Sequence, residues 1–572
     1  MQTLAALFAL TASLVTRVQG QETHVSSYAT AAVAADHELA SQAGAEILKA
    51  GGNAVDAAVA TSFALSVVRP YSCGIGGGGF MVIHLRQHPR TGPVTTAINY
   101  RETGPAWVTP NAFESDPDPD SPTHGPKAVC TPGTVAGLLY ALEKYGTMSR
   151  AQVLAPAIRL AESGFLVDDH YANTAHHDDL VLPWFAKDPT RRDRFRFLWD
   201  RFLMGGQVKV GDRIHVPEQA RALRLIAEQG HDAFYKGEIA RAIAKATDNR
   251  ISLADLENYH VKVTPVLEHS WRGNRILTMP PPSSGGIVLA QTLAMLDRRD
   301  ADLASLVNAK AHNIAAYIHL LAETFKSSFA DRARWMGDPD FVDVPTQRLL
   351  DSTYLHAMAD AIDLSRTRSP ETYGTPLPED GGTSHLCAID AQGNAVACTE
   401  TINLIFGSMV AVEEFGFILN DEMDDFLTRA SRANAFGLAH AERNRPQPGK
   451  RPLSSMTPTI VVGADAGVRL IAGGAGGPRI ISGTIQTLLN ALAWDMPAGD
   501  AVRVPRFHHQ WHPNRVELEP ALEPGDVPAG LRERGHDVGQ RKVVGTIQVI
   551  RRGKGVWEAA SDPRKGGKPA GY

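Results

Sequence analysis

Cysteine is scarce in this chain: 572 residues contain four, at Cys73, Cys130, Cys387 and Cys398. Four cysteines cannot form a disulfide scaffold for a chain of this length, and no pair of them has the spacing of metal ligands. Cys387 and Cys398 stand roughly opposite each other in a predicted hairpin. A cross-strand disulfide is therefore an alternative, and two buried free thiols are the favoured interpretation.

The chain also lacks a dominant charge, N-glycosylation sequons, repeats and low-complexity tracts. Lys and Arg number 57 against 62 Asp and Glu, which gives a formal net charge of −5. This balance provides no electrostatic basis for binding nucleic acid. A hydrophobic fraction of 43% and a charged fraction of 21% are ordinary for a globular protein, and a chain of this length can bury a large core.

The apolar run at the N-terminus is too short to span a membrane. It covers residues 4–15, and Val18-Gln19-Gly20 then offers small residues at the two positions that a signal peptidase reads. We therefore expect residues 1–20 to be a signal peptide that directs the protein into the secretory pathway, where it would be secreted, vacuolar or associated with a surface. An uncleaved anchor or a short buried helix is the alternative.

Apolar periodicity predicts several helices in the first half of the chain. Residues 37–49 and 54–68 form the first two, with Asn53 as N-cap of the second, which is apolar on nearly every side and should be buried. Further helices are expected at residues 135–145, 151–163, 218–228 and 310–332. A proline-rich loop at residues 279–286 leads into another helix from Ile287.

A glycine-rich segment at residues 74–80 mimics a dinucleotide-binding fingerprint through the spacing of Gly74, Gly76 and Gly79. A helix precedes this segment and a strand at residues 80–85 follows it, which reverses the order that the fingerprint requires. The nucleotide interpretation is therefore rejected.

From Thr383 onward, short strands become frequent. They are predicted at residues 383–389, 395–401, 457–462 and 468–471, and glycines at 474–477 open a helix that runs through residues 481–492. Strand-rich and helix-rich parts in one chain indicate sheets covered by helices.

The sequence Gly382-Thr383-Ser384-His385 is the most informative feature of the chain. A polar, turn-rich stretch at residues 378–381 precedes it, so cleavage before Thr383 would leave a threonine at the head of a buried strand. Such a residue carries a nucleophilic hydroxyl and a base, because its α-amine has a reference pKa of about 8. By itself, the Gly-Thr-Ser sequence predicts only the start of a strand.

Four polar clusters strengthen this signal. They are Thr401-Ile402-Asn403, the acidic turn 420–426, the serine pair within residues 450–456, and Gly476-Gly477 at a helix start. Carboxylates can bind the ammonium of an amino-acid head group, hydroxyl and Arg donors can bind its carboxylate, and N–H groups at a helix start can bind an oxyanion. Each cluster also has an ordinary interpretation: a solvated turn or weak calcium site, a helix cap, or the first turn of a helix.

Together the motifs resemble the γ-glutamyltransferases (γ-glutamyltranspeptidases, glutathione hydrolases) of the N-terminal-nucleophile hydrolase superfamily. The resemblance extends from about residue 31 to residue 572. Beyond the clusters above, it includes residues 51–58, 74–80, 100–102, 132–137, 280–286, 505–511, 560–564 and 571–572.

The resemblance implies a fold and a processing step. The expected fold is α+β, a four-layer αββα sandwich. Self-cleavage after Gly382 would leave a large subunit of residues 21–382 and a small subunit of residues 383–572. The two subunits would form a heterodimer with one composite catalytic domain.

The resemblance also implies an activity and four catalytic residues. Thr383 corresponds to the nucleophile, Thr401 to a threonine whose hydroxyl supports it, and Gly476 and Gly477 to the oxyanion hole. The implied enzyme cleaves the γ-glutamyl bond of glutathione or other γ-glutamyl compounds. It passes the glutamyl group to water, or to an amino acid or dipeptide, without a cofactor or a metal.

Six further positions match substrate-binding residues of the family. Those that hold the α-carboxylate of the γ-glutamyl group correspond to Arg101, Ser454 and Ser455. Those that hold its α-amine correspond to Asn403, Glu422 and Asp425. Because none of these positions is lost, the resemblance implies an active enzyme.

Some positions depart from the family or suggest other chemistry. Ile405 replaces a tyrosine of animal relatives, and Phe436, in a segment like the lid loop of bacterial relatives, also replaces a tyrosine. Phenylalanine can cover a pocket but cannot donate a hydrogen bond, which bears on the balance between hydrolysis and transfer. His508, His509 and His512 invite a metal interpretation, yet they lie in or beside the 505–511 signature, which is structural in the family.

Three alternative functions are weighed against this one. The first is an acylase of the same fold that acts on β-lactam side chains or on polyglutamate, and the head-group residues argue against a non-glutamyl acyl group. The second is a dedicated role in trimming γ-glutamate from glutathione adducts. The third is an unprocessed, non-catalytic binding protein, which the intact set of site residues disfavours.

Overall fold

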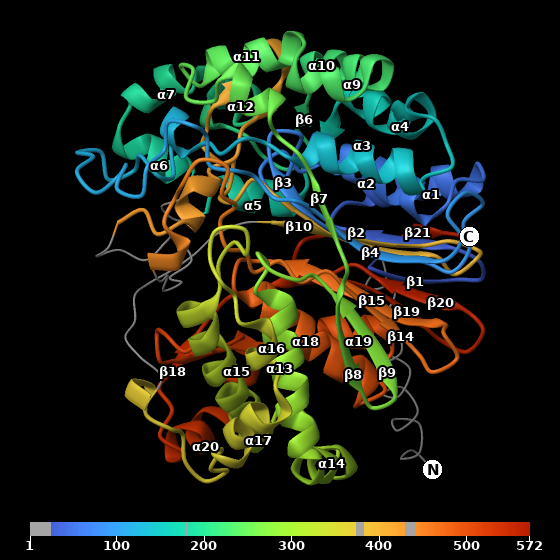
Figure 1. Ribbon diagram of the computed structural model, residues 1–572, viewed down its shortest axis with the longest axis vertical. Helices are drawn as coiled ribbons and strands as arrows, with labels where there is room; N and C mark the ends of the chain where they lie inside the picture. The colour runs from blue at the N-terminus through green and yellow to red at the C-terminus, as the bar shows by residue number, and fades with distance from the viewer. Residues whose placement is uncertain (1–23, 178–180, 373–382, 430–441) are drawn as a thin grey trace, which may run out of the picture.

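Two β-sheets pack face to face, and helices cover the outer side of each, so the molecule has four layers (Figure 1). The structure is a computed structural model that describes residues 24–177, 181–372, 383–429 and 442–572. The arrangement confirms the expected α+β, αββα fold. Within these residues, no helix has both the length and the apolar character needed to cross a membrane.

Both sheets have seven strands, and every neighbouring pair in them is antiparallel. The spatial order of the first sheet is β21 (Ala570–Gly571), β2 (Ala32–Ala35), β10 (Ser384–Ile389), β11 (Ala395–Thr401), β3 (Gly78–Leu85), β4 (Val94–Tyr100) and β7 (Lys262–Thr264). The order of the second is β1 (Val25–Tyr28), β20 (Trp557–Ala560), β19 (Thr546–Arg552), β15 (Val468–Ala475), β14 (Thr459–Val462), β9 (Asn274–Thr278) and β8 (Leu267–Trp271). Each sheet therefore takes strands from both sides of residue 383.

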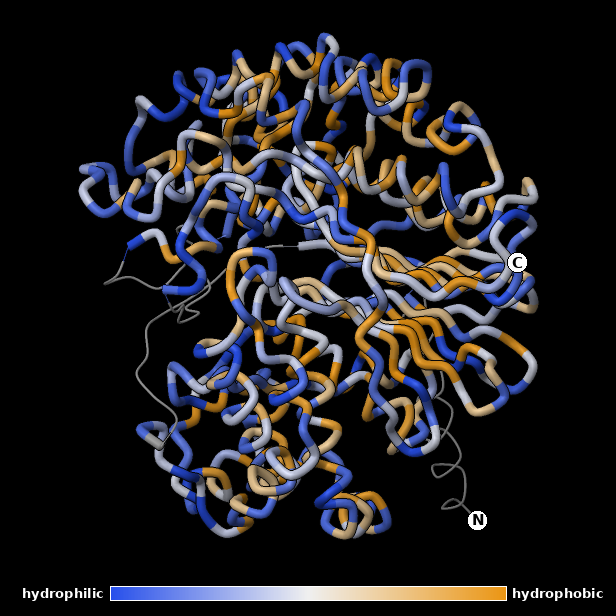
Figure 2. The backbone as a smooth tube through the Cα atoms, viewed as in Figure 1, coloured by the Kyte–Doolittle hydropathy of each residue, from blue (hydrophilic) through white to orange (hydrophobic). Residues whose placement is uncertain are grey.

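The space between the sheets is apolar, as the orange strands at the centre of Figure 2 show. Cys387 and Ile389 of β10 meet Ile471 of β15 and Ile550 of β19 there, all fully buried. The alternate residues of β10 point to the opposite face and join the core beneath the helices. Successive residues of β10 therefore alternate between two buried faces.

The strand register keeps two of the cysteines apart. Cys387 pairs with Ala397, whereas Cys398 pairs with Leu386. The offset of one residue places the two thiols on opposite faces of the sheet. All four cysteines are buried and free, which confirms the favoured interpretation.

Helices pack directly on the outer faces of the sheets. The first sheet is covered by α1 (Glu38–Lys49), α2 (Ala54–Val68) and α3 (Thr134–Tyr145), and the second by α13 (Gly285–Arg298), α18 (Arg479–Leu492) and α19 (Ala498–Arg503). Every residue of α2 is buried, because the sheet lies on one side and α1 and α4 (Arg150–Ser163) lie on the others. Asn53 caps α2 as predicted, in a capping box with Asp56.

Most of the predicted helices are confirmed to within one residue at each end, including α3, α4 and α9 (Pro217–Gln229). The helix predicted at residues 310–332 is displaced, since α15 covers Ala315–Trp335. Lys310 and Asn313 have φ angles of +53° and +55°. A right-handed helix cannot include this left-handed conformation, so α15 begins after both residues.

Shorter helices complete the two outer layers. Those above the first sheet in Figure 1 are α5 (Asp169–Ala175), α6 (Leu182–Lys187), α7 (Thr190–Arg194), α8 (Arg196–Arg201), α10 (His231–Tyr235), α11 (Glu238–Ala246) and α12 (Leu253–Glu257). Those below the second sheet are α14 (Asp300–Asn308), α16 (Thr346–Leu349), α17 (Ser352–Asp360) and α20 (Val527–Glu533).

Candidate active site

One small cavity collects most of the predicted site residues. Its open space is about 270 Å³, and eight of the ten predicted residues line it. The lining consists of Arg101, Thr383, Thr401, Asn403, Asp425, Ser454, Ser455, Met456, Gly477 and Ile480. The remaining two predicted residues lie next to this lining, because Glu422 forms an ion pair with Arg101 and Gly476 precedes Gly477 in the chain.

The paired strands β10 and β11 bring two threonines together at one end of their hairpin. The hydroxyls of Thr383 and Thr401 are 3.3 Å apart. Thr401 Oγ1 also accepts the backbone N–H of Asn403 at 2.8 Å, and the side-chain amide of Asn403 donates to the Asp421 carbonyl at 3.1 Å. Thr383 is 5% exposed, so its hydroxyl is held at the cavity wall with little freedom.

A lysine from the C-terminal segment contacts the same threonine, and sequence reasoning missed it. The buried Lys565 Nζ donates to the Thr383 carbonyl oxygen at 2.6 Å and to Ser384 Oγ at 3.2 Å. Its charge is balanced by Asp36, whose Oδ2 lies 2.6 Å away. Lys565 directly follows the recognised 560–564 signature, but no spacing rule connects it with a residue 182 positions earlier.

Arg101 lies just after β4 and is surrounded by buried carboxylates. Its guanidinium pairs with Glu422 at 2.5 Å, with Asp425, and with Glu102 at 3.5 Å. Burial lowers the pKa of Arg101, but attraction to these acids outweighs burial and raises it. Burial raises the pKa of Glu422 well above its usual range and that of Glu102 to about 8.

The acidic turn Glu422–Asp425 is buried, so it is not the solvated turn of the ordinary interpretation. Asn420 fixes its position: the side-chain amide donates to the carbonyls of Gly76 and Cys130 at 2.8 and 2.9 Å, and its oxygen accepts the Glu422 N–H at 3.1 Å. The glycine-rich segment 74–80 thus supports the acidic turn. A side chain at Gly76 would meet the Ile418 carbonyl oxygen at 2.2 Å.

The serine pair is positioned by the proline-rich loop. The Ser454 N–H donates to the Pro282 carbonyl at 3.0 Å, and the Ser454 carbonyl accepts both the N–H and the hydroxyl of Ser284, at 2.8 and 2.6 Å. Sequence reasoning also missed Arg332 of α15, which donates to Ser284 Oγ at 2.9 Å and to Ser455 Oγ at 3.4 Å. Burial lowers the pKa of Arg332 to about 10, so a second buried cation lies beside the serines at neutral pH.

Gly476 and Gly477 form the turn between β15 and α18. Their φ angles of +121° and +58° lie in the left-handed region that favours glycine. A side chain at Gly476 would also meet Gly545 Cα at 3.1 Å. The turn brings the backbone at the start of α18 to the cavity. N–H groups at the start of a helix can stabilise a negatively charged ligand atom.

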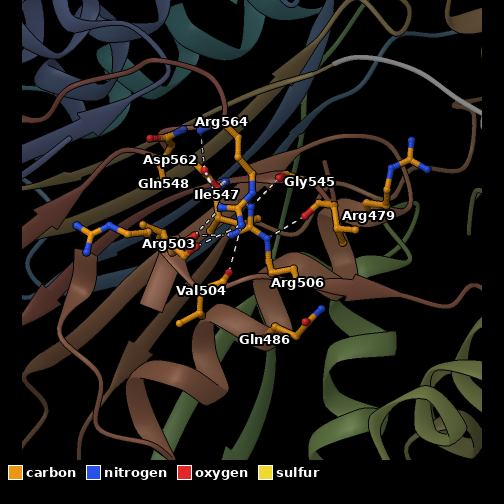
Figure 3. A network of polar contacts seen from close by, with 12 residues as sticks. Arg479, Gln486, Arg503, Val504, Arg506, Gly545, Ile547, Gln548, Asp562 and Arg564 are labelled. Atoms are coloured by element: carbon orange, nitrogen blue, oxygen red, sulfur yellow. Dashed lines mark hydrogen bonds and ion pairs between the residues drawn. The ribbon is translucent and has the colours of Figure 1, made fainter. Parts of the chain in front are cut away.

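A buried ion-pair network, drawn in Figure 3, binds Gly545, the residue that lies against Gly476. Arg506 Nη2 donates to Asp562 Oδ2 at 2.6 Å and to the Gly545 carbonyl at 2.7 Å. Asp562 also accepts the Ile547 N–H at 2.9 Å and pairs with Arg564 at 3.1 Å. Burial raises the pKa of Asp562, but attraction to Arg506 and Arg564 outweighs it, so the pKa is lowered.

The histidines of the 505–511 signature belong to the core. The two ring nitrogens of His508 contact Ser482 Oγ and Gln510 Oε1, each at 2.8 Å. His508, His509 and His512 are absent from the one cluster of possible metal ligands found among the described residues. Gly382, Phe436 and residues 1–20 lie outside the described residues.

Comparisons with known proteins agree with this geometry. The family model Gamma-glutamyltranspeptidase matches residues 40–572. A glutathione hydrolase proenzyme of Escherichia coli (strain K12) is 39% identical over 542 residues, covering 93% of this chain and 90% of the relative.

Two solved structures are similar in fold. The cephalosporin acylase from Bacillus halodurans has a TM-score of 0.79 at 26% identity and covers 96% of this chain and 97% of its own. The γ-glutamyltranspeptidase of Helicobacter pylori has a TM-score of 0.53 at 36% identity, covering 59% of this chain and 93% of its own. With the family match across nearly its whole length, this chain belongs to the gamma-glutamyltranspeptidase family.

Proposed function

We propose that the protein is a γ-glutamyltransferase and glutathione hydrolase that works through a γ-glutamyl ester on Thr383. The observation that carries the proposal is the single cavity that collects the Thr383 hydroxyl, Gly477 and the charged groups Arg101 and Asp425. A nucleophile, an oxyanion site and opposite charges for an amino-acid head group are the parts that this chemistry requires.

The first step is maturation. Thr383 Oγ attacks the carbonyl carbon of Gly382, the Gly382–Thr383 C–N bond breaks, and the acyl group moves from nitrogen to oxygen. Water then hydrolyses the ester, which restores the hydroxyl and leaves a free α-amine on Thr383. The products are a large subunit that ends at residue 382 and a small subunit of residues 383–572, which remain together because both contribute strands to both sheets.

Catalysis then repeats this chemistry on the substrate. The α-amine of Thr383 takes the hydroxyl proton while Oγ attacks the γ-carbonyl carbon of glutathione or a related amide. The N–H groups of Gly476 and Gly477 stabilise the oxyanion, at roughly 3–4 kcal/mol per donor in comparable sites. The amine leaves with the transferred proton, and the 3.3 Å contact from Thr401 orients the nucleophile.

The head group is recognised by an exchange of ion pairs. In this structure Arg101 pairs with Asp425 and Glu422. We propose that the substrate α-carboxylate takes the place of an acid at Arg101 and also binds Ser454 and Ser455. Its ammonium then binds the released acids and the Asn403 side chain, so each charged group of the site keeps a partner of opposite sign.

The acyl-enzyme is resolved by water, which gives glutamate, or by an amino acid or dipeptide, which gives a new γ-glutamyl bond. No metal or cofactor takes part in these steps. We also propose that residues 1–20 direct the precursor into the secretory pathway, because a short apolar run there is followed by small residues at the positions that a signal peptidase reads.

The first test is the substitution Thr383→Ala, with Thr383→Ser as its matched control. We expect Thr383→Ala to remain one chain and to release no p-nitroaniline from γ-glutamyl-p-nitroanilide. Thr383→Ser retains a hydroxyl and should be cut before residue 383 and show measurable turnover. Intact-mass spectrometry and the chromogenic assay decide the matter: a Thr383→Ala protein that is processed and active would refute the proposed nucleophile.

A matched pair of substrates separates this function from that of an acylase. Glutaryl-p-nitroanilide differs from γ-glutamyl-p-nitroanilide only in lacking the α-amino group. A site built to bind that ammonium should discriminate against the glutaryl substrate by roughly 10⁴-fold in kcat/KM. Equal turnover of the two substrates would favour the acylase alternative.

A further inference from the structure

A second cluster of chemically active side chains lies in the helical layer below the second sheet, separate from the cavity. His319 and Glu323 are four residues apart on α15, so they share one helix face. His536 lies just after α20, which packs against α15 (Figure 1). One ligand atom from each residue lies within 4.8 Å of the others, and all three side chains are buried.

The hydrogen bonds of the two histidines define their protonation. His319 Nε2 is 2.8 Å from the Asp363 carbonyl oxygen, which can only accept, so this nitrogen carries the proton. In a neutral His319 the other nitrogen, Nδ1, is therefore unprotonated and can only accept a hydrogen bond. Because Nδ1 lies 2.7 Å from His536 Nε2, the proton of this hydrogen bond belongs to His536 Nε2.

We propose that His319 Nδ1, His536 Nε2 and the Glu323 carboxylate form a binding site for Zn²⁺. Two imidazole nitrogens and one carboxylate are a ligand set that zinc accepts, with water or another donor in the fourth position. At Zn–N distances of about 2.0–2.1 Å, tetrahedral ligands are about 3.3 Å apart. The two nitrogens need therefore separate by only about 0.6 Å from their 2.7 Å contact. The proton of His536 moves to its Nδ1, and no proton need be released.

The surroundings resemble the outer shell of a zinc site. A ligating histidine usually donates its second N–H to a carbonyl or carboxylate, as His319 does to Asp363. Ligating carboxylates are themselves hydrogen-bonded, and Glu323 Oε1 accepts from Thr367 Oγ1 at 2.5 Å and from Lys326 Nζ at 2.9 Å. The Lys326 ammonium opposes a dication, so we expect a moderate affinity rather than the very high affinity of a thiolate site.

The site connects the two parts of the chain that the proposed processing would separate. His319 and Glu323 precede residue 383, whereas His536 follows it. The segment that precedes residue 373 contacts the same cluster: the Asp363 carbonyl accepts from His319, and the Thr367 hydroxyl and the Arg368 N–H donate to Glu323. Zinc would thus join the large and small subunits. This bridging role rests on the proposed cleavage, whereas zinc binding itself does not.

The experiment measures zinc in the full-length protein after chelator treatment, addition of ZnCl₂ and dialysis. We expect one zinc per chain and a higher melting temperature with zinc. His319→Asn and His536→Gln keep an amide nitrogen near each ligand position, and both should lose the bound zinc and the shift in melting temperature. The control is His231→Gln, which changes an exposed histidine outside the cluster and should behave as wild type.

Two further measurements separate zinc binding from cleavage and from a folding defect. The uncleaved Thr383→Ala precursor should bind zinc as well, so failure of the cleavage proposal would not affect this one. Should the histidine variants fail to fold, the visible spectrum of the Co²⁺-loaded wild type decides, because tetrahedral coordination gives intense bands. No retained zinc in the wild type, unchanged zinc in both variants, or no tetrahedral cobalt spectrum would overturn the proposal.

Discussion

Glu400 should make the protein less stable as the pH rises through neutrality. It directly precedes Thr401 on β11, but its side chain points to the opposite face, beneath α2, and is 2% exposed. It accepts hydrogen bonds from Ser62 Oγ and, at 3.2 Å, from the Tyr100 hydroxyl. No cation faces it in these contacts, and burial raises its pKa from 4.5 to about 7.

The magnitude follows from linkage between protonation and folding. A carboxyl whose pKa is higher in the folded state binds its proton more tightly there, so its contribution is favourable at low pH. That contribution declines between the unfolded pKa of 4.5 and the folded pKa of about 7. The difference of about 2.5 between the folded and unfolded pKa values corresponds to about 3 kcal/mol. The free energy of unfolding should therefore be lower by about this amount at pH 8 than at low pH.

The substitution Glu400→Gln removes the titration and keeps the size of the side chain. We expect the variant to be more stable than wild type by up to about 3 kcal/mol at pH 8 and about equally stable near pH 4.5, as measured by urea unfolding at several pH values. Infrared titration should also show a protonated carboxyl signal at pH 6 that the variant lacks. A stability difference independent of pH, or a Glu400 fully ionised at pH 5.5, would refute the reasoning.

Two further substitutions test the site. Arg101→Lys keeps the charge but loses the planar guanidinium that contacts two acids. We therefore expect kcat/KM for γ-glutamyl-p-nitroanilide to fall by roughly 10- to 100-fold. Unchanged kinetics would argue against a role of Arg101 in binding the head group. Lys565→Met leaves the Asp36 carboxylate buried without its cation and should lower the free energy of unfolding by about 3–5 kcal/mol. Adding Asp36→Asn should restore most of that loss in urea unfolding, and no restoration would contradict the pairing.

The parts of the fold that the sequence predicted well are those with one dominant local signal. The helix α2 combines an N-cap, apolar residues on nearly every side and a following glycine-rich segment, and its predicted bounds match Ala54–Val68. The hairpin of β10 and β11 has a short apolar run on each strand and a turn rich in Asp, Gly and Asn. Local signals of this kind need no knowledge of distant partners.

The errors arose where a distant contact decides the local structure. The sequence predicts a strand that ends at residue 471 and glycines at 474–477 that open a helix, yet β15 continues to Ala475. Gly473 and Gly474 pair with β19 there, and a side chain at Gly473 would meet the His385 ring at 2.3 Å. Gly473 thus permits the two sheets to approach closely, Gly474 lies within the strand, and only the packed structure distinguishes these glycines from those of a turn.

The site residues were predicted by resemblance to a family and not by periodicity, because they are spread from residue 101 to residue 477. The sequence motifs identified the groups that would contact a substrate. They did not identify Lys565 and Arg332, which reach the site from elements whose positions depend on the complete fold. A buried cation far away in the sequence has no local signature.

The ion pairs of the cavity explain how such a polar site can be buried at all. A lone buried guanidinium or carboxylate would be strongly unfavourable, because little water can reach it. Arg101 and the acids around it reduce this cost by pairing with one another. An amino-acid head group carries both charges, so it can replace the internal pairs one for one. A ligand with only a carboxylate would occupy Arg101 and leave the acids unpaired, and the self-paired site therefore favours a zwitterion over a simple acid.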